Sequence, residues 1–174
     1  MPERQFTEAE LHAALEQLTP ERFQEWEGRL AQIAPQLQRT IVQILAEGGW
    51  VRLAPAWHTS TTPKGTVTIP AGLVVNLGGK TVYHLGDTGL FSDLQLVKAR
   101  DKVDVALMCI GGHYTMDRHD AVDAADFVGA KTIIPCHYDT FPAIETDDGA
   151  FQTDIEKTLD AVCVVLEPGA VHQA

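Results

Sequence analysis

The sequence predicts a mixed α/β protein in which a small helical segment precedes a sheet-forming region. Residues 1–48 carry apolar side chains at helical spacing and contain no strand-like run. After this stretch, short runs rich in valine and isoleucine alternate with amphipathic helical stretches, an order typical of α/β proteins. Glycine or proline punctuates these segments. We therefore divide the 174-residue chain into a helical segment, 1–48, and an α/β region, 49–174.

The helical segment is predicted to hold two or three helices. A capping-box pattern over residues 7–10 starts the first helix, and a Thr-Pro-Glu sequence at 19–21 starts the second. Pro35 is expected to break or kink the second helix. A third helix spans 37–45 and is stopped by the glycine pair at 48–49.

The first part of the α/β region predicts strands joined by a polar loop and a hairpin. A short strand covers 51–53, and a polar loop covers 56–63. Two apolar runs, 73–77 and 80–85, flank Gly78-Gly79, which is a strong signal for a two-residue hairpin turn.

The second part predicts helices and buried strands in alternation. Ser92 is expected to cap a short helix, and an apolar strand follows over 103–110. Asp117 is expected to start a helix that Gly129 closes.

Three further elements complete the region. A buried strand covers 132–136, a helix carries the apolar stripe of 151–159, and a last strand covers 162–166.

Composition excludes several classes of function. The net charge of −11 argues against sequence-independent binding to nucleic acid or to anionic lipid. No apolar run approaches the ~20 residues that span a membrane. The first residues lack an apolar signal core, and the three cysteines lie in apolar runs. We therefore expect a cytoplasmic protein with buried, free thiols.

Three polar residues follow predicted strands and are candidates for one site. His58, Asp87 and His137 each lie where an apolar run ends in a loop. Histidine nitrogens and aspartate oxygens are common ligands of divalent metals. Each histidine alone is more often a hydrogen-bonded structural residue, and Gly-Asp-Thr-Gly alone is more often an ordinary Asx turn. Together they predict a metal site.

Four motifs follow one another along the α/β region: Pro55–Ser60, Tyr83–Phe91, Ile110–Met116 and Ile134–Pro142. In this order they resemble the metallo-β-lactamase superfamily, in particular its branch of small metal-dependent hydrolases. The resemblance covers about residues 50 to 170, and the closing Val164–Gly169 also fits that branch.

The resemblance implies an αββα sandwich with a one- or two-metal site at one edge of its sheets. It makes His58 a ligand of the first metal, Asp87 the bridging and catalytic aspartate, and His137 a ligand of the second metal. In such sites the metal activates a water molecule that attacks the substrate. Zinc is the first expectation for the ion, with manganese or iron as alternatives.

The same resemblance suggests residues that line the site or support its ligands. These are Thr88, His113, Tyr114 and Phe141. His84, near the Gly-Asp turn, is expected to pack beneath the site instead.

One departure from the family pattern limits what the chain can do alone. The main metal motif, His-x-His-x-Asp-His, is absent ahead of His58, where His12 is the one histidine. The chain then carries about three of seven usual ligands, so we expect any divalent metal to be held weakly. A sheet face and an edge would also need a cover.

Two hypotheses follow, with a third that is less well supported. The first is a hydrolase of small-molecule substrates whose site is completed by another chain, by a homo-oligomer contact or by further sequence. The second is a catalytically inactive half-domain that acts as a binding or structural module. The third is an acidic helical adaptor attached to a remnant domain. Fold analogy does not choose the substrate.

Overall fold

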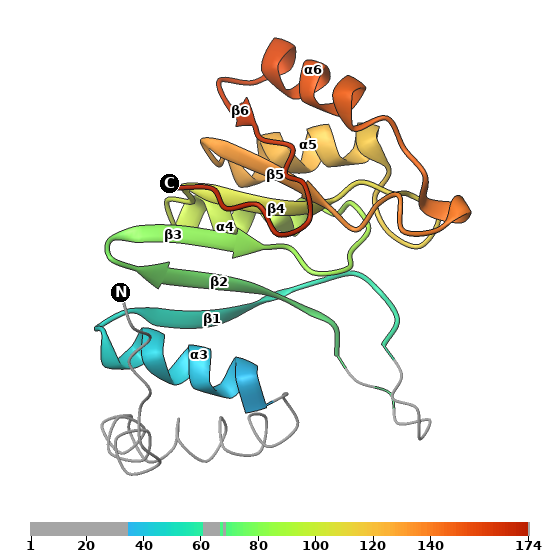
Figure 1. The fold of residues 1–174 in the computed structure, drawn as a ribbon. Helices are drawn as coiled ribbons and strands as arrows, with labels where there is room; N and C mark the ends of the chain where they lie inside the picture. The colour runs from blue at the N-terminus through green and yellow to red at the C-terminus, as the bar shows by residue number, and fades with distance from the viewer. Residues whose placement is uncertain (1–34, 61–66, 68, 174) are drawn as a thin grey trace. The chain divides into compact units, whose positions relative to one another are not determined.

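The computed structural model describes residues 35–60, 67 and 69–173, with side chains from residue 39 onward (Figure 1). The helices predicted from residues 7–10 and 19–21 lie outside the described residues. The chain separates into two compact units. The first comprises Met1–Val51 with Asn76–Gly79, and the second comprises Arg52–Val75 with Lys80–Ala174. The boundary drawn at residues 48 and 49 stays a prediction.

The described elements alternate between helix and strand for most of the chain. In order they are α3 (Pro35–Ala46), β1 (Trp50–Pro55), β2 (Ala71–Leu77), β3 (Lys80–His84), the 3₁₀ turn η1 (Ser92–Leu94), α4 (Gln95–Arg100), β4 (Val105–Cys109), α5 (Arg118–Val128), β5 (Thr132–Cys136), the 3₁₀ turn η2 (Pro142–Ile144), α6 (Asp148–Thr158) and β6 (Val162–Cys163). This confirms the mixed α/β class. None of the described helices combines the length and apolar content that crossing a bilayer requires.

The strands form one sheet in sequence order, from β1 to β6. Strand β4 pairs in parallel with both β3 and β5, and β5 pairs in parallel with β6. The β2–β3 connection is the predicted hairpin, in which Gly78 and Gly79 adopt positive φ angles of 59° and 80°. Such angles at both turn residues match the right-handed twist of a strand pair. Figure 1 shows β2 running opposite to its neighbours.

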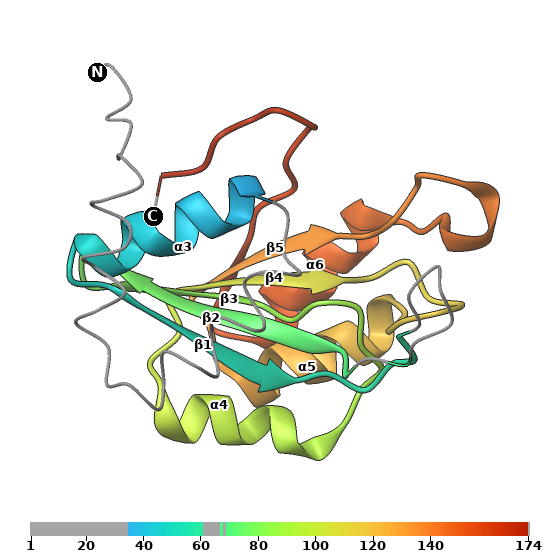
Figure 2. The same ribbon diagram turned by 90° about the horizontal axis from the view of Figure 1, so that it is seen from below.

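Helix α5 shows how the sequence sets an element and its packing. The Asp117 side chain accepts hydrogen bonds from the backbone N–H groups of His119 and Asp120, and Gly129 ends the helix in the left-handed conformation. Three alanines lie buried on its inner face, so the helix approaches its neighbours closely. Helices α4 and α5 lie on one face of the sheet (Figure 2). The core cluster includes the fully buried side chains of Tyr83, Leu85, Leu94, Met108, Ile110 and Phe151.

Two expectations about individual elements were wrong. Ser92 does not cap the helix after it, because the 3₁₀ turn η1 begins at Ser92 itself and Phe91 takes the N-cap position, with no side-chain capping bond. The last strand covers only Val162–Cys163, although the apolar run continues to residue 166. Apolar residues record burial, but a strand also requires a ladder partner, and β5 supplies one for only two residues.

Candidate metal and catalytic site

The predicted site residues all follow strands that end on the same side of the sheet. His58 lies three residues after β1, Asp87 three residues after β3, and His137 directly after β5. Strands β1, β3, β4 and β5 point the same way in Figure 1. In α/β proteins this carboxyl edge is where binding and catalytic loops gather. The whole candidate site lies within the second compact unit.

Asp87 and His137 form the centre of the candidate site. Their closest atoms, Asp87 Oδ2 and His137 Nε2, lie 3.7 Å apart. The side chains keep 52% and 32% of their surface exposed, so solvent reaches both. The two groups attract each other as an ion pair only when the imidazole is protonated. A neutral imidazole and a carboxylate facing each other across this gap are both available as ligands.

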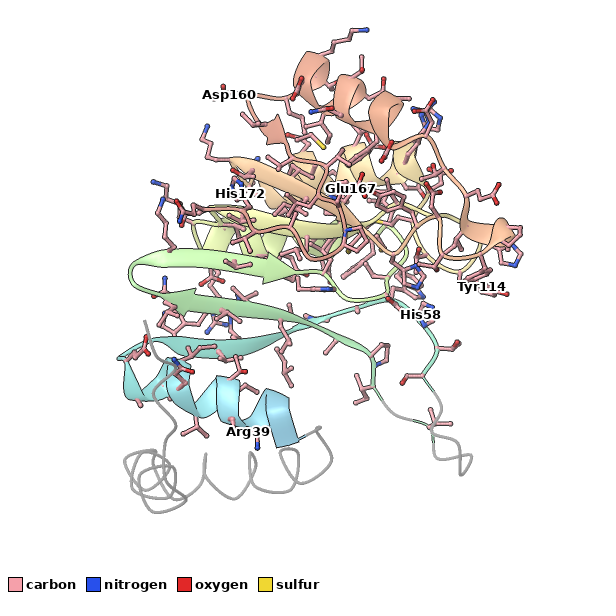
Figure 3. All side chains as sticks on the ribbon, in the orientation of Figure 1. Arg39, His58, Tyr114, Asp160, Glu167 and His172 are labelled. Atoms are coloured by element: carbon pink, nitrogen blue, oxygen red, sulfur yellow. The ribbon has the colours of Figure 1, made fainter. Side chains whose placement is uncertain are left out.

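His58 is not brought into this pair. Its Nδ1 lies 2.5 Å from the backbone carbonyl of Thr59, which makes Nδ1 the donor and leaves Nε2 free. Within residues 35–60, 67 and 69–173, no group of three or more His, Cys, Asp or Glu side chains is arranged to hold a metal ion. Figure 3 shows His58 and Tyr114 on the side where the parallel strands end.

The donor set therefore fits a divalent metal in part. An imidazole nitrogen and a carboxylate oxygen 3.7 Å apart suit two ligands of one ion, because metal–ligand bonds to such atoms are about 2.0–2.2 Å long. A stable site takes three or four protein ligands. The described residues supply two of them at one point, so they do not close a metal site by themselves.

Thr88 ties the loop that carries His58 to the loop that carries Asp87. Its side chain is fully buried, and its hydroxyl accepts a 2.9 Å hydrogen bond from the backbone N–H of Trp57. The same hydroxyl donates to the carbonyl of Gly89, whose N–H in turn donates to the carbonyl of Trp57. Trp57, next to His58, is thereby bonded to Thr88, next to Asp87.

The backbone of Thr88 extends this connection to the loop that follows β4. Its carbonyl accepts hydrogen bonds from the Met116 N–H, at 2.9 Å, and from the Cys109 thiol, at 3.5 Å. Three loops consequently meet at one buried residue that immediately follows Asp87. Thr88 was predicted to line the site or to support its ligands. Its hydrogen bonds join the loops that carry the candidate ligands.

Gly111 brings the β4 loop against His137. A Cβ atom at this position would lie 2.5 Å from the carbonyl oxygen of His137 and 2.8 Å from the Cβ of Ile144. Contacts this short do not occur, so only glycine allows the two loops to approach so closely. The sequence marked Gly111 as the end of a strand, but gave no sign of this neighbour.

Backbone strain gathers in the same two loops. Among the described residues other than glycine, positive φ angles occur at His113 (58°), His137 (54°) and Asp139 (57°). Each such conformation costs on the order of 1–3 kcal/mol for a residue with a side chain. Strain of this kind concentrates at functional sites, where the surrounding structure holds a side chain in a required direction.

Two buried polar atoms near the site have no hydrogen-bond partner. They are Nδ1 of His137 and the hydroxyl of Thr115. An unpartnered buried polar atom costs about 1–3 kcal/mol and in a native protein often marks a functional group. Two more such atoms, on Arg52 and Tyr83, belong to β1 and β3 and lie outside these loops.

The loops at the carboxyl ends of the strands also carry aromatic side chains. The Tyr114 ring meets the ring of His113 edge-on at a centroid distance of 4.3 Å and lies 6.3 Å from the ring of Phe141. Tyr114 and Phe141 are 58% and 43% exposed. Trp57, which is 72% exposed, packs edge-on against Phe91.

Cys136, which directly precedes His137, is not a nucleophile. Cys109 and Cys136 lie side by side on β4 and β5, and all three cysteines are free thiols, as expected. Burial, with smaller contributions from Cys109 and Asp87, raises the pKa of Cys136 to about 12. The thiolate is the form that attacks substrates, so the Cys136 thiol is protonated and unreactive at neutral pH.

His84 has a different place from the one expected. It is exposed rather than packed beneath the site, and its Nδ1 accepts a 2.9 Å hydrogen bond from the backbone N–H of Gly86. The surrounding residues remove part of the water around the ring, and this desolvation lowers the pKa of His84, against a smaller opposite effect of Asp87. His84 thus holds the turn that presents Asp87.

Comparison with known proteins identifies the class. Residues 2–138 match the family model described as "Beta-lactamase superfamily domain", and the chain belongs to that family. The expected resemblance is thereby confirmed.

Relatives within the superfamily narrow the assignment. A UPF0173 metal-dependent hydrolase of Thermus thermophilus is 46% identical over 127 residues, which cover 72% of this chain and 55% of that protein. One from Oenococcus oeni is 50% identical over 105 residues, covering 58% of this chain and 46% of the relative. The chain thus spans about half the length of the curated relatives it matches.

A solved structure agrees with this fold. Igni18, described as a metallo hydrolase from Ignicoccus hospitalis, superimposes with a TM-score of 0.66 at 40% identity, covering 74% of this chain and 54% of that one. The relatives and this neighbour are thus described as metal-dependent or metallo hydrolases.

Proposed function

We propose that this chain supplies part of the active site of a metal-dependent hydrolase, with Asp87 and His137 as metal ligands. The approach of Asp87 Oδ2 to His137 Nε2, at 3.7 Å and within reach of solvent, carries the proposal. Further support comes from the strained backbone at His137 and from the family to which the chain belongs. When bound, a divalent ion supplies a water molecule whose pKa is lowered toward neutrality.

The chain's own residues have distinct roles in this proposal. Asp87 contributes a carboxylate oxygen that can bind an ion or accept a proton from water, and is the catalytic residue of the set. His137 contributes Nε2, aimed by its left-handed backbone conformation. His58 has Nε2 free and joins as a third ligand after a movement of its loop. Zinc is the expected ion, with manganese or iron as alternatives, and it is held weakly.

The remaining ligands come from outside the described residues. They are supplied by further sequence, by a complementing chain with a His-x-His-x-Asp-His segment, or by a second copy of this chain. The substrate in this proposal is a small molecule, and the setting is the reducing cytoplasm, which the three free thiols support.

Zinc titration of the purified chain by calorimetry tests the proposal. We expect weak binding that falls at least about 10-fold in Asp87→Asn and in His137→Gln, because each removes one of two ligands. Asp93→Asn and His119→Gln are matched controls, since they change an exposed carboxylate and an exposed imidazole elsewhere. Adding a polypeptide that carries the His-x-His-x-Asp-His segment should raise the affinity of the unaltered chain.

A second candidate function is a catalytically inactive half-domain that acts as a binding or structural module. The observation in its favour is that the described residues contain no three-ligand cluster. In this case the Asp87 and His137 variants would bind zinc with the same affinity as their controls, with or without the added segment. That result would support the inactive module and exclude the hydrolase.

A further inference from the structure

The loops at the carboxyl ends of the strands expose two aromatic rings beside the candidate ligands. Tyr114 belongs to the loop after β4, and Phe141 belongs to the loop after β5. Their ring centroids lie 6.3 Å apart at an angle of 45°, and both rings are largely open to solvent. Exposed aromatic rings in contact are a surface on which a planar group can stack.

Backbone contacts hold the loop that carries Tyr114 against the segments that carry Asp87 and His137. The Met116 N–H donates to the carbonyl of Thr88, and Gly111 abuts the carbonyl of His137. The loop that carries Tyr114 is therefore anchored at one end beside Asp87 and at the other beside His137.

The loop that carries Phe141 is closed by its own hydrogen bonds. The N–H of Asp139 donates to the carbonyl of Ile144, and the N–H of Ile144 donates to the carbonyl of Phe141. Phe141 is four residues from His137 in the same loop. The backbone of both loops is therefore held by hydrogen bonds or close contacts, and the two rings contact each other.

The described parts of the loops at the carboxyl ends of the strands carry several carboxylates. Residues 56–60, 86–91, 110–117 and 137–147, all described by the structure, include no lysine or arginine. Arg118, which follows the third of these loops, forms an ion pair with Asp154 on α6. The exposed carboxylates in these loops belong to Asp87, Asp117, Asp139, Glu145 and Asp147.

We infer that Tyr114 and Phe141 form the binding surface for an aromatic or other planar apolar group of an uncharged substrate. This inference rests on the proposed function, because the reacting end of the substrate then lies at Asp87 and His137. The rings supply apolar area, and a flat group stacks on them. The five exposed carboxylates of the described loops, with no lysine or arginine among them, disfavour an anionic group on the rings.

Saturation-transfer NMR on the full chain, without added metal, tests this with three small probes. Benzamide is neutral and aromatic, benzoate is aromatic and anionic, and acetamide is neutral without a ring. We expect benzamide to bind more tightly than both others. We also expect the affinities of benzamide and benzoate to become more similar as the salt concentration is raised, because salt screens the charge of the carboxylates.

Variants assign the binding to the two rings. Tyr114→Ala and Phe141→Ala should each weaken benzamide about 2- to 10-fold, whereas Tyr114→Phe should keep most of the binding. Leu96→Ala is the control, because Leu96 is an apolar residue of α4 with 64% of its surface exposed. Thermal unfolding of each variant shows whether it is folded.

Three results would overturn the inference. If benzoate binds as tightly as benzamide at low salt, the surface does not prefer an uncharged substrate. Unchanged benzamide binding in the folded Tyr114→Ala, Phe141→Ala double variant places the surface elsewhere. A change in sedimentation mass in that variant, without a change in probe binding, makes the rings a protein contact. Since no metal is added, these results are independent of the zinc titration that tests the proposed function.

Discussion

The two ends of the parallel strands are built differently, although the same strands supply both. At the amino ends, Arg52 pairs with Asp101, Lys98 lies 3.9 Å from Asp126, and Lys131 lies 2.8 Å from Asp160. Figure 3 shows Asp160 on the side opposite His58 and Tyr114. The turns at this end place glycine, at positions 78, 79 and 129, where φ is positive.

The loops at the carboxyl ends of the strands differ in their backbone angles and in their charges. His113, His137 and Asp139 adopt positive φ angles with side chains attached, and the described loops contain carboxylates without a lysine or arginine among them. The aromatic rings of Trp57, Tyr114 and Phe141 are 72%, 58% and 43% exposed there, against 37% for Trp50 at the amino end of β1. The difference shows that the amino ends are organised for stability, whereas the carboxyl ends retain strain and unpaired charge that a binding site can use.

The largest loss of stability is expected at Gly111, where the loops after β4 and β5 leave no room for a side chain. Gly111→Ala should lower the free energy of unfolding by about 3 kcal/mol, because the added methyl group meets backbone atoms of His137 and Ile144. Gly149→Ala is the matched control: its Cβ would lie 3.5 Å from the nearest atom, so the change should be neutral or stabilising by about 0.5–1 kcal/mol. Urea unfolding measures both. Equal effects would mean that the approach of Gly111 to His137 does not matter.

A smaller loss is expected from the buried hydroxyl that joins the loops. Thr88→Val should cost about 2 kcal/mol, because the Trp57 N–H loses its acceptor inside the protein. Thr88→Ser keeps the hydroxyl and loses one methyl group, so it should cost about 1 kcal/mol. The opposite order in urea unfolding would assign the role of Thr88 to packing.

The strain at the carboxyl ends predicts a still smaller effect. His113→Val should destabilise the protein by about 1 kcal/mol, because a β-branched residue is poorly accommodated at φ 58°. His113→Asn should be close to neutral, since asparagine tolerates the left-handed region. Thermal unfolding of the pair checks this. Valine and asparagine variants of equal stability would contradict strain at this position.

The smallest effect is expected at the amino ends. The hydrogen bond from Lys131 lowers the pKa of the Asp160 carboxyl, so the pair contributes stability only above the unfolded pKa near 3.8 and loses it as pH falls. Both side chains are exposed and screened, so Lys131→Met should not change stability measurably at neutral pH. A clear loss in urea unfolding at pH 7 would show that this end depends on its ion pairs.

Much of the fold was predictable because its signals are local. Asp117 and Gly129 delimited α5, and Gly78-Gly79 identified the β2–β3 hairpin, since caps and turns are set by neighbouring residues. The cap predicted at Ser92 failed because the 3₁₀ turn begins one residue earlier than predicted, at Ser92 itself, which leaves Phe91 in the N-cap position. The extra residues of the last predicted strand failed because strand formation depends on a distant partner.

The sequence by itself determined which residues end which strands, and hence that Asp87 and His137 follow β3 and β5. The family pattern in the same motifs named them as ligands. Only the tertiary structure decided that these two meet at 3.7 Å while His58 bonds to its own loop. It also decided that Thr88 and Gly111 hold the loops together. The contacts of Asp87, Thr88 and Gly111 join residues 20 or more positions apart in the sequence. Their distances depend on packing that no local pattern encodes.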